Sequence, residues 1–224
     1  MSMPAKHLPA MLTLADLLQG YADAPSLPVQ GIASDSRRVR DGYIFLACQG
    51  ISSHGLDYAA EAKAAGASAV VYDASTPEVP DDIGLPIVAV EGLGEKLGDI
   101  ASRFYDHPSE SLRVIGVTGT NGKTTVAWLI AECARFLGLR CAYLGTLGYG
   151  VDELQMTGGM TTPAAIELQE RLAEFVKQGA DFAAIEVSSH ALSQGRVDGV
   201  RFEAPLFTNL TRDHLDYHSD MRAY

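Results

Sequence analysis

The sequence predicts an α/β protein with two domains, a small N-terminal α/β domain and a second domain built on a mostly parallel sheet. Two observations predict this fold class. Short apolar runs typical of buried strands alternate with segments of helical spacing, and after residue 112 the alternation becomes longer and more regular. The 224 residues, 47% of them hydrophobic, can form one large domain or two smaller ones with a sizeable core.

The first domain is expected over residues 1–107. Its predicted elements are, in order, a helix over 12–21, a strand over 43–47, a helix over 58–65, strands over 69–72 and 86–90, and a helix over 93–105. The first helix rests on the spacing of leucines, and the second is alanine-rich and ends at Gly66. Residues 106–109 combine Pro108 with polar capping residues, which predicts the domain junction there.

The second domain is expected over residues 108–224, as an incomplete P-loop-type domain. Its predicted elements are, in order, a strand over 112–117, a helix over 123–137, a strand over 141–144, a helix over 163–177, and strands over 182–187 and 202–209. Pro163 fits the first turn of its helix. Strands that alternate with helices imply a parallel sheet covered on both faces.

Composition excludes several classes of protein. The formal net charge of -11, from 17 Lys and Arg against 28 Asp and Glu, argues against a nucleic-acid or anionic-membrane binder. Cys48, Cys133 and Cys141 are odd in number and form no C-x-x-C pair, so we expect reduced, mostly buried thiols. There is no convincing signal peptide and no apolar run of about 18 residues. We therefore expect a soluble cytoplasmic protein. We also expect a monomer, although composition does not determine the oligomeric state.

The strongest motif is G-T-N-G-K-T-T at residues 119–125, between a predicted strand and a predicted helix. Glycines let backbone N–H groups turn toward phosphate oxygens, and the helix that follows presents its positive end. Lys123 can then reach the β- and γ-phosphates, and the Thr124 hydroxyl can ligate Mg²⁺. The general P-loop pattern has glycine at the position of Val117, so the alternative is a glycine-rich turn with an exposed lysine.

Two ionisable residues follow predicted strands of the same domain. Glu186 falls at the carboxyl end of a strand, where open α/β sheets bind ligands, and a carboxylate there can hold Mg²⁺. His214 lies in the charged run 212–216 directly after another strand, which is costly to keep except at a polar site. The alternatives are a capping or surface carboxylate and a histidine satisfied by ordinary hydrogen bonds.

Several segments resemble the Mur ligases. V-T-G-T-N-G-K-T-T at 117–125 resembles the phosphate loop that these enzymes share with the folylpolyglutamate synthetases, which form amides through an acyl phosphate. E-V-S-S-H-A-L at 186–192 and T-N-L-T-R-D-H-L-D-Y-H at 208–218 resemble elements of the MurE branch. D-S-R at 35–37 resembles the element that receives the uridine end of the substrate. The resemblance covers nearly the whole chain.

The resemblance implies an ATP-dependent ligase of peptidoglycan precursor synthesis that uses ATP and Mg²⁺. It would add the third residue, with diaminopimelate as the expected amino acid and lysine as the alternative, to UDP-MurNAc-L-Ala-D-Glu. Residues 1–107 would bind the uridine nucleotide, and residues 108–224 would form part of the central ATP-binding domain. No counterpart of the family's carbamylated lysine or C-terminal amino-acid-binding domain appears before Tyr224, so we expect weak or no turnover from this chain.

The resemblance also implies roles for individual residues. ATP would be bound by Gly119, Thr120, Asn121, Gly122, Lys123, Thr124 and Thr125. The catalytic residues would be Lys123, Glu186 and His214, with Thr124 and Glu186 on a first metal ion and His214 on a second. The substrate would be bound by Ser34, Ser36, Ile51, Ser52, Ser53, Thr161, Thr162, Ser188, Gln194 and Arg196. For the N-terminal serines the alternative is ordinary turn capping.

Other functions fit parts of this pattern. Another ligase of the same superfamily would share the phosphate loop, and a sister Mur ligase would differ in the length of its peptide substrate. A non-catalytic P-loop nucleotide-binding module would share the loop but would not require a UDP-sugar. If the loop is only a turn, ATP would not change the melting temperature.

Overall fold

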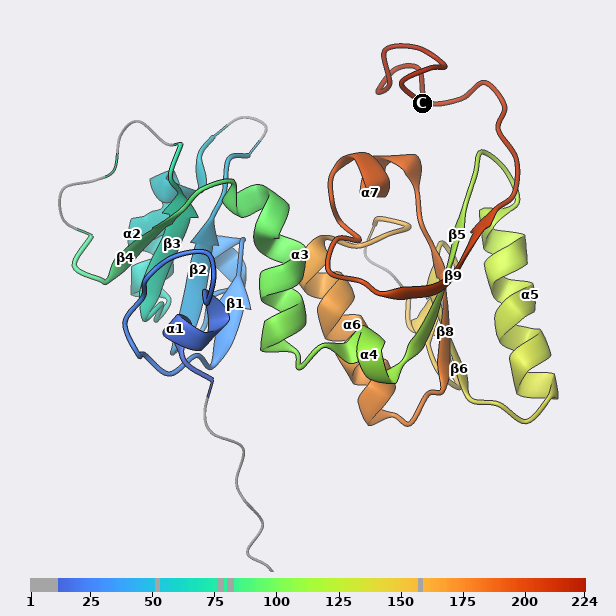
Figure 1. Cartoon of the computed structure of the whole chain (residues 1–224), viewed down its shortest axis with the longest axis horizontal. Helices are drawn as coiled ribbons and strands as arrows, with labels where there is room; N and C mark the ends of the chain where they lie inside the picture. The colour runs from blue at the N-terminus through green and yellow to red at the C-terminus, as the bar shows by residue number, and fades with distance from the viewer. Residues whose placement is uncertain (1–11, 51–52, 76–78, 80–82, 157–158) are drawn as a thin grey trace, which may run out of the picture. The chain divides into compact units, whose positions relative to one another are not determined.

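A computed structural model describes residues 12–50, 53–75, 79, 83–156 and 159–224. By their internal contacts the residues divide into two compact units, 1–94 and 95–224 (Figure 1). The division falls within helix α3 (Leu93–Phe104), 13 residues before the boundary expected from the sequence. Gly98 of α3 lies so close to Asp198 that a Cβ atom there would be 2.0 Å from the Asp198 carbonyl oxygen, which ties the helix to the second unit.

The first unit is built on a four-stranded parallel sheet in the order β1-β2-β3-β4. Its elements are α1 (Leu14–Leu17), β1 (Gly31–Ala33), η1 (Ser36–Arg38), β2 (Tyr43–Ala47), η2 (Gly55–Tyr58), α2 (Ala59–Ala64), β3 (Ala69–Asp73) and β4 (Ile87–Val90). Phe45 and Val70 of the central strands pack with Leu56 and Ala62 from η2 and α2. The apolar runs of the sequence therefore form the inner strands of a buried sheet.

The second unit is built on a five-stranded sheet in the order β7-β6-β8-β5-β9, in which only the edge pair β6–β7 is antiparallel. Its elements after α3 are α4 (Pro108–Ser111), β5 (Arg113–Thr118), α5 (Lys123–Phe136), β6 (Cys141–Gly145), β7 (Gly148–Gly150), α6 (Ala165–Lys177), β8 (Phe182–Glu186), α7 (Ser189–Ser193) and β9 (Phe202–Phe207). This arrangement is the mostly parallel α/β sheet that the sequence predicts.

Helices cover both faces of this sheet (Figure 1). On one face Leu168, Leu172 and Phe175 of α6 pack against the buried side chains of β6 and β8. On the other face Ala127 and Ala131 of α5 pack against Tyr143 and Ala184. Small residues on α5 let the helix lie close to the sheet. The phosphate-loop helix is therefore held rigidly against the strands that end at the candidate site.

The register of the strands brings three loops to one edge of the sheet. Val117 of β5 pairs with Glu186 of β8, and Thr118 pairs with Phe207 of β9. Because the three strands are parallel, the chain segments that follow them, at residues 119–122, 187–188 and 208–211, leave the sheet at the same edge. The polar motifs of the sequence lie in these three segments.

Most predicted elements are present, with bounds that differ by a few residues. The first helix is the main exception, since α1 covers only Leu14–Leu17 of the predicted 12–21. Leu14, Leu17 and Leu18 are fully buried, so the leucine spacing reports burial against the core and not helix length. Among the described residues no helix has the length and apolar character needed to cross a membrane.

The three cysteines differ in environment. Cys133 is exposed on α5, Cys141 is buried in β6, and Cys48 is half-buried after β2. Burial raises the pKa of the Cys48 thiol to about 12 and that of the Cys141 thiol to about 11. A thiolate, and not a thiol, attacks alkylating reagents. We therefore expect iodoacetamide at about pH 8 to modify Cys133 well before the other two, as read by peptide mass spectrometry.

The variant Cys133→Ser supplies the control for this prediction. It should lack the fast phase of modification, and all thiols that remain should react only after the chain is unfolded. Rapid modification of Cys48 or Cys141 in the folded wild-type protein would contradict the burial that we describe.

Candidate functional site

The phosphate loop occupies residues 119–122, between β5 and α5. Gly119 has a φ of 126°, and a Cβ atom there would lie 2.2 Å from Thr208 Oγ1. Gly122 has a φ of 85° and is the N-cap of α5, with no side-chain hydrogen bond to the helix. Both positions require glycine for conformation, and Gly119 also for space. The first N–H groups of α5 thus receive no side-chain cap from Gly122 and are available to an anion.

The Lys123 ammonium lies over this loop. Its Nζ donates hydrogen bonds to the carbonyl oxygens of Gly119 at 2.7 Å and Thr120 at 3.0 Å. An ammonium has three donors, so one remains for a ligand. The two carbonyls hold the positive charge at the mouth of the loop, where a phosphate would meet it.

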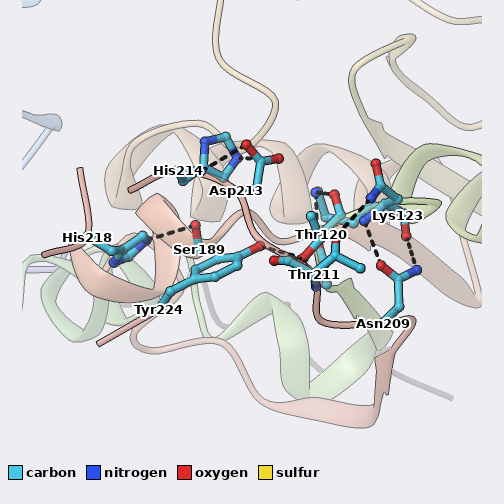
Figure 2. A network of polar contacts seen from close by, with 11 residues as sticks. Thr120, Lys123, Ser189, Asn209, Thr211, Asp213, His214, His218 and Tyr224 are labelled. Carbon is cyan, nitrogen blue, oxygen red and sulfur yellow. Dashed lines mark hydrogen bonds and ion pairs between the residues drawn. The ribbon is translucent and has the colours of Figure 1, made fainter. Parts of the chain in front are cut away.

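The segment after β9 ties down the phosphate loop (Figure 2). The Thr120 N–H donates to the Asn209 carbonyl at 2.9 Å, and the Asn121 N–H donates to Asn209 Oδ1 at 3.1 Å. The Thr211 N–H donates to Thr120 Oγ1 at 2.9 Å. These contacts use the amides of Thr120 and Asn121, so a phosphate would meet the amides at the start of α5 instead. Asn209 lies in the segment 208–218 that resembles the MurE branch, but no role was predicted for it.

Glu186 and Thr124, predicted as ligands of one metal ion, are in contact. The Thr124 hydroxyl donates to Glu186 Oε2 at 2.9 Å, and Glu186 is fully buried at the end of β8. A carboxylate and a hydroxyl are the hard oxygen donors that suit Mg²⁺. No group of three His, Cys, Asp or Glu side chains suited to a metal occurs in the described part of the chain.

His214 lies on the other side of the same site, with a left-handed φ of 51°. Its Nε2 is 3.8 Å from Asp213 Oδ2 (Figure 2). Its ring also meets the His190 ring edge-on, at 4.9 Å between centroids. Partial burial, followed by the neighbouring charges of His214 and His218, lowers the pKa of His190. His190 was not predicted as a site residue. Its place directly after Ser188 and Ser189 in a matched segment was the available signal.

These groups border one pocket of about 450 Å³ in the second unit. The pocket is lined by Thr120, Asn121, Gly122, Lys123, Thr124, Thr146, Met160, Thr161, Glu186, Ser188, His190, Arg196 and His214. Most residues predicted for ATP, metal and substrate in this unit are therefore brought together. Thr146 and His190 are additions of the structure. The predicted residues Gly119, Thr125, Thr162 and Gln194 do not line the pocket.

Thr162 and Gln194 instead contact residues that border the pocket. The fully buried Thr162 hydroxyl donates to the Glu186 carbonyl at 2.8 Å and accepts from the Ser188 N–H at 3.1 Å. Gln194 Oε1 accepts from Arg196 Nε at 2.9 Å, and Arg196 Nη1 donates to the Thr162 carbonyl at 3.0 Å. Both side chains thus support Ser188 and Arg196, and their predicted contact with substrate stays a prediction.

The predicted serines of the first unit lie at one edge of its own sheet. Ser34 follows β1 and is exposed, whereas Ser36 begins η1 and is buried. The Ser53 hydroxyl, after the neighbouring strand β2, is 3.2 Å from the Tyr58 hydroxyl. The predicted residues Ile51 and Ser52 lie outside the described residues. Carboxyl ends of parallel strands are where such sheets bind ligands, so the location agrees with a nucleotide site.

Two family models match the chain. The Mur ligase middle domain matches residues 117–224, and the model described as Mur ligase family, catalytic domain, matches residues 28–105. The chain belongs to the Mur ligase family. The first of these matches contains the phosphate loop, Glu186 and His214, so the pocket lies within the Mur ligase middle domain.

Curated Mur ligases with similar sequences are named UDP-N-acetylmuramoyl-L-alanyl-D-glutamate–2,6-diaminopimelate ligase. The one from Xanthomonas campestris pv. campestris strain 8004 is 46% identical over 95% of this chain. The one from Alkalilimnicola ehrlichii is 46% identical over 96% of the chain. The chain spans 43% and 45% of the length of these two relatives.

Solved Mur ligase structures have the same fold. A structure of UDP-N-acetylmuramoyl-L-alanyl-D-glutamate–2,6-diaminopimelate ligase matches 96% of this chain and 43% of its own with a TM-score of 0.78 and 33% identity. A MurF ligase from Thermotoga maritima, solved in complex with ADP, matches 87% of this chain and 41% of its own with a TM-score of 0.60 and 21% identity. At that identity the MurF likeness concerns the fold alone.

Proposed function

We propose that this chain is part of an ATP-dependent ligase that adds diaminopimelate to UDP-MurNAc-L-Ala-D-Glu. The observation that carries the proposal is the pocket in which Lys123, Thr124 and Glu186 meet Ser188 and Arg196. It combines a site for a nucleoside triphosphate with cationic and hydroxyl groups for an anionic second substrate. The relatives whose name states this reaction are 46% identical to the chain.

The proposed reaction has two steps. The free carboxylate of the D-Glu residue attacks the γ-phosphorus of ATP, which forms an acyl phosphate and releases ADP. The amine of diaminopimelate then attacks the acyl carbon, an amide bond forms, and phosphate leaves. The site therefore needs no side-chain nucleophile. It needs positive charge near the phosphoryl group and fixed positions for the carboxylate and ATP.

Several residues of the pocket have a part in this proposal. The amides at the start of α5 and the Lys123 ammonium bind the phosphates of ATP. Thr124 and Glu186 would hold Mg²⁺, which when bound neutralises phosphate charge, and His214 would serve a second ion. Arg196, braced by Gln194 and the Thr162 carbonyl, would bind an anionic group of the muramoyl substrate together with Ser188.

In the first unit, Ser34, Ser36 and the loop at Ser53 would receive the uridine end of the substrate.

We place the ligase in the cytoplasm, as a monomer without nucleic-acid or membrane partners. The cytoplasm is where ATP and UDP-linked precursors are available to it.

Calorimetric titration with UDP-MurNAc-L-Ala-D-Glu and, in parallel, UDP-MurNAc-L-Ala tests the proposal. We expect the dipeptide form to bind about 10–100-fold more tightly, since a hydrogen bond to a charged group contributes about 1.5–3 kcal/mol. UDP alone is the control for the uridine end. Equal affinity for the two muramoyl ligands would reject the third-residue assignment. Binding of ATP with Mg²⁺ but of neither muramoyl ligand would indicate a nucleotide-binding module.

A further inference from the structure

The Glu186 carboxylate is enclosed by hydrogen-bond donors on both oxygens. Oε1 accepts from the Tyr143 hydroxyl in a short contact and from the Thr146 N–H at 2.8 Å. Oε2 accepts from the Thr124 hydroxyl at 2.9 Å and from the Thr146 hydroxyl at 3.2 Å. Four donors match the roughly four acceptor positions of a carboxylate. These donors replace the water that the fully buried carboxylate loses.

The donors on the two oxygens differ in kind. Tyr143 is fully buried in β6 and the Thr146 N–H belongs to the backbone, so neither donor of Oε1 can readily turn away. The donors of Oε2 are two hydroxyls that line the pocket. A threonine hydroxyl can rotate and offer a lone pair to a cation instead.

Two neighbours fix the Tyr143 contact in space. A Cβ atom at Gly145 would lie 2.1 Å from Glu186 Oε1 and 2.6 Å from the Tyr143 hydroxyl oxygen, so glycine leaves the room in which these groups meet. On the other side, Trp128 of α5 meets the Tyr143 ring edge-on, at 5.4 Å between centroids and an interplanar angle of 81°. The helix that starts at the phosphate loop thus also packs against the tyrosine.

We propose that Tyr143 is a positioning residue, which with the Thr146 N–H holds Glu186 Oε1 and thereby presents Oε2, beside the Thr124 hydroxyl, to the metal ion that accompanies ATP. Tyr143 itself does not touch the metal ion or the substrate. The inference rests on the proposed function, since the metal ion at Thr124 and Glu186 is part of that proposal. It adds a residue 43 positions from Glu186 in sequence, on a strand that carries none of the predicted site residues.

The test is the affinity of the 224-residue chain for ATP, measured by calorimetry with excess Mg²⁺ and again with EDTA. The ratio of the two affinities is the gain due to the metal ion. We expect Tyr143→Phe to reduce this gain about tenfold or more and to leave the affinity in EDTA unchanged, because loss of an outer-shell partner commonly costs about 10–100-fold in metal affinity. A purely structural role of Tyr143 would lower both affinities alike.

Four further variants complete the experiment. Tyr149→Phe is the matched control. Tyr149 lies on the neighbouring strand β7, and its hydroxyl donates to Gln155 Oε1 at 2.7 Å and not to Glu186. This variant should keep the full gain. Glu186→Gln should lose the gain, and the double variant with Tyr143→Phe should lose no more. Gly145→Ala keeps Tyr143 but displaces the Glu186 carboxylate from it, so this variant should also lose the gain. It replaces Tyr143→Phe in the experiment if Tyr143→Phe does not fold.

The outcomes separate this inference from the proposed function. If Glu186→Gln loses the gain while Tyr143→Phe or Gly145→Ala keeps it, the positioning role is rejected and the metal site stands. Equal losses in Mg²⁺ and in EDTA for Tyr143→Phe also reject it. If wild-type protein shows no gain from Mg²⁺ at all, both the metal site of the proposed function and the inference fail.

Discussion

Replacement of Lys123 by methionine should weaken the binding of ATP with Mg²⁺ about 10–100-fold, the equivalent of about 1.5–3 kcal/mol for a hydrogen bond to a charged group. Its ammonium lies over the phosphate loop, held by the Gly119 and Thr120 carbonyls, with a third donor left for a phosphate. Methionine keeps the length of the side chain and removes both the charge and the donors. The loss should therefore appear in binding and leave the fold intact.

Calorimetry of wild-type and Lys123→Met protein measures this loss, and Lys177→Met is the matched control. Lys177 is exposed in the last turn of α6, so its replacement changes net charge by the same amount without touching the pocket. We expect the control to bind ATP as the wild type does. Wild-type affinity in Lys123→Met would show that the loop does not use this ammonium, and would favour a simple glycine-rich turn.

Replacement of Phe175 by alanine should have the largest effect on stability. Its side chain is fully buried in α6, within the core cluster that packs this helix against β6 and β8. Truncation of a buried phenylalanine removes apolar burial and leaves a cavity, so we expect the free energy of unfolding to fall by about 3–5 kcal/mol. Domains of this kind have a free energy of unfolding of only about 5–15 kcal/mol, so the variant should unfold at a lower temperature than the wild type.

Urea denaturation followed by circular dichroism gives the comparison, with Phe136→Ala as the control. Phe136 ends α5 and is 91% exposed, so its truncation should change the free energy of unfolding by no more than about 0.5 kcal/mol. Similar losses in the two variants would mean that α6 does not cover the sheet as described. The same measurement at several ATP concentrations would also show whether the nucleotide stabilises the fold.

Several parts of this molecule could be predicted because local pattern and burial agree. The apolar run at Tyr43–Ala47 forms β2 with the predicted bounds, and the helix after the phosphate loop forms α5 over Lys123–Phe136. β2 is an inner strand of its sheet, and α5 packs on the other sheet through the buried Ala127 and Ala131. The strands β1 and β7, with three residues each, and the five-residue helix α7 were not predicted. Such short elements carry too little periodicity, and pairing with longer neighbours decides them.

The phosphate loop, Glu186 and His214 could be predicted as site residues from sequence because each belongs to a contiguous motif at the end of a strand. The partners that orient them were not. Tyr143 and Thr146 reach Glu186 across 43 and 40 positions of the sequence, and Asn209 reaches Asn121 across 88. Nothing local in the chain distinguishes a tyrosine that donates to a buried carboxylate from one that only fills a core.

The sequence by itself thus determined the fold class and the order of the main strands and helices, and it predicted the candidate site residues. The tertiary structure decided which of those residues face one pocket, which support it from behind, and which donors surround Glu186. The physical reason is that strand order and register bring distant segments to one edge of the sheet. Hydrogen bonds between side chains depend on that placement, and local sequence pattern does not record it.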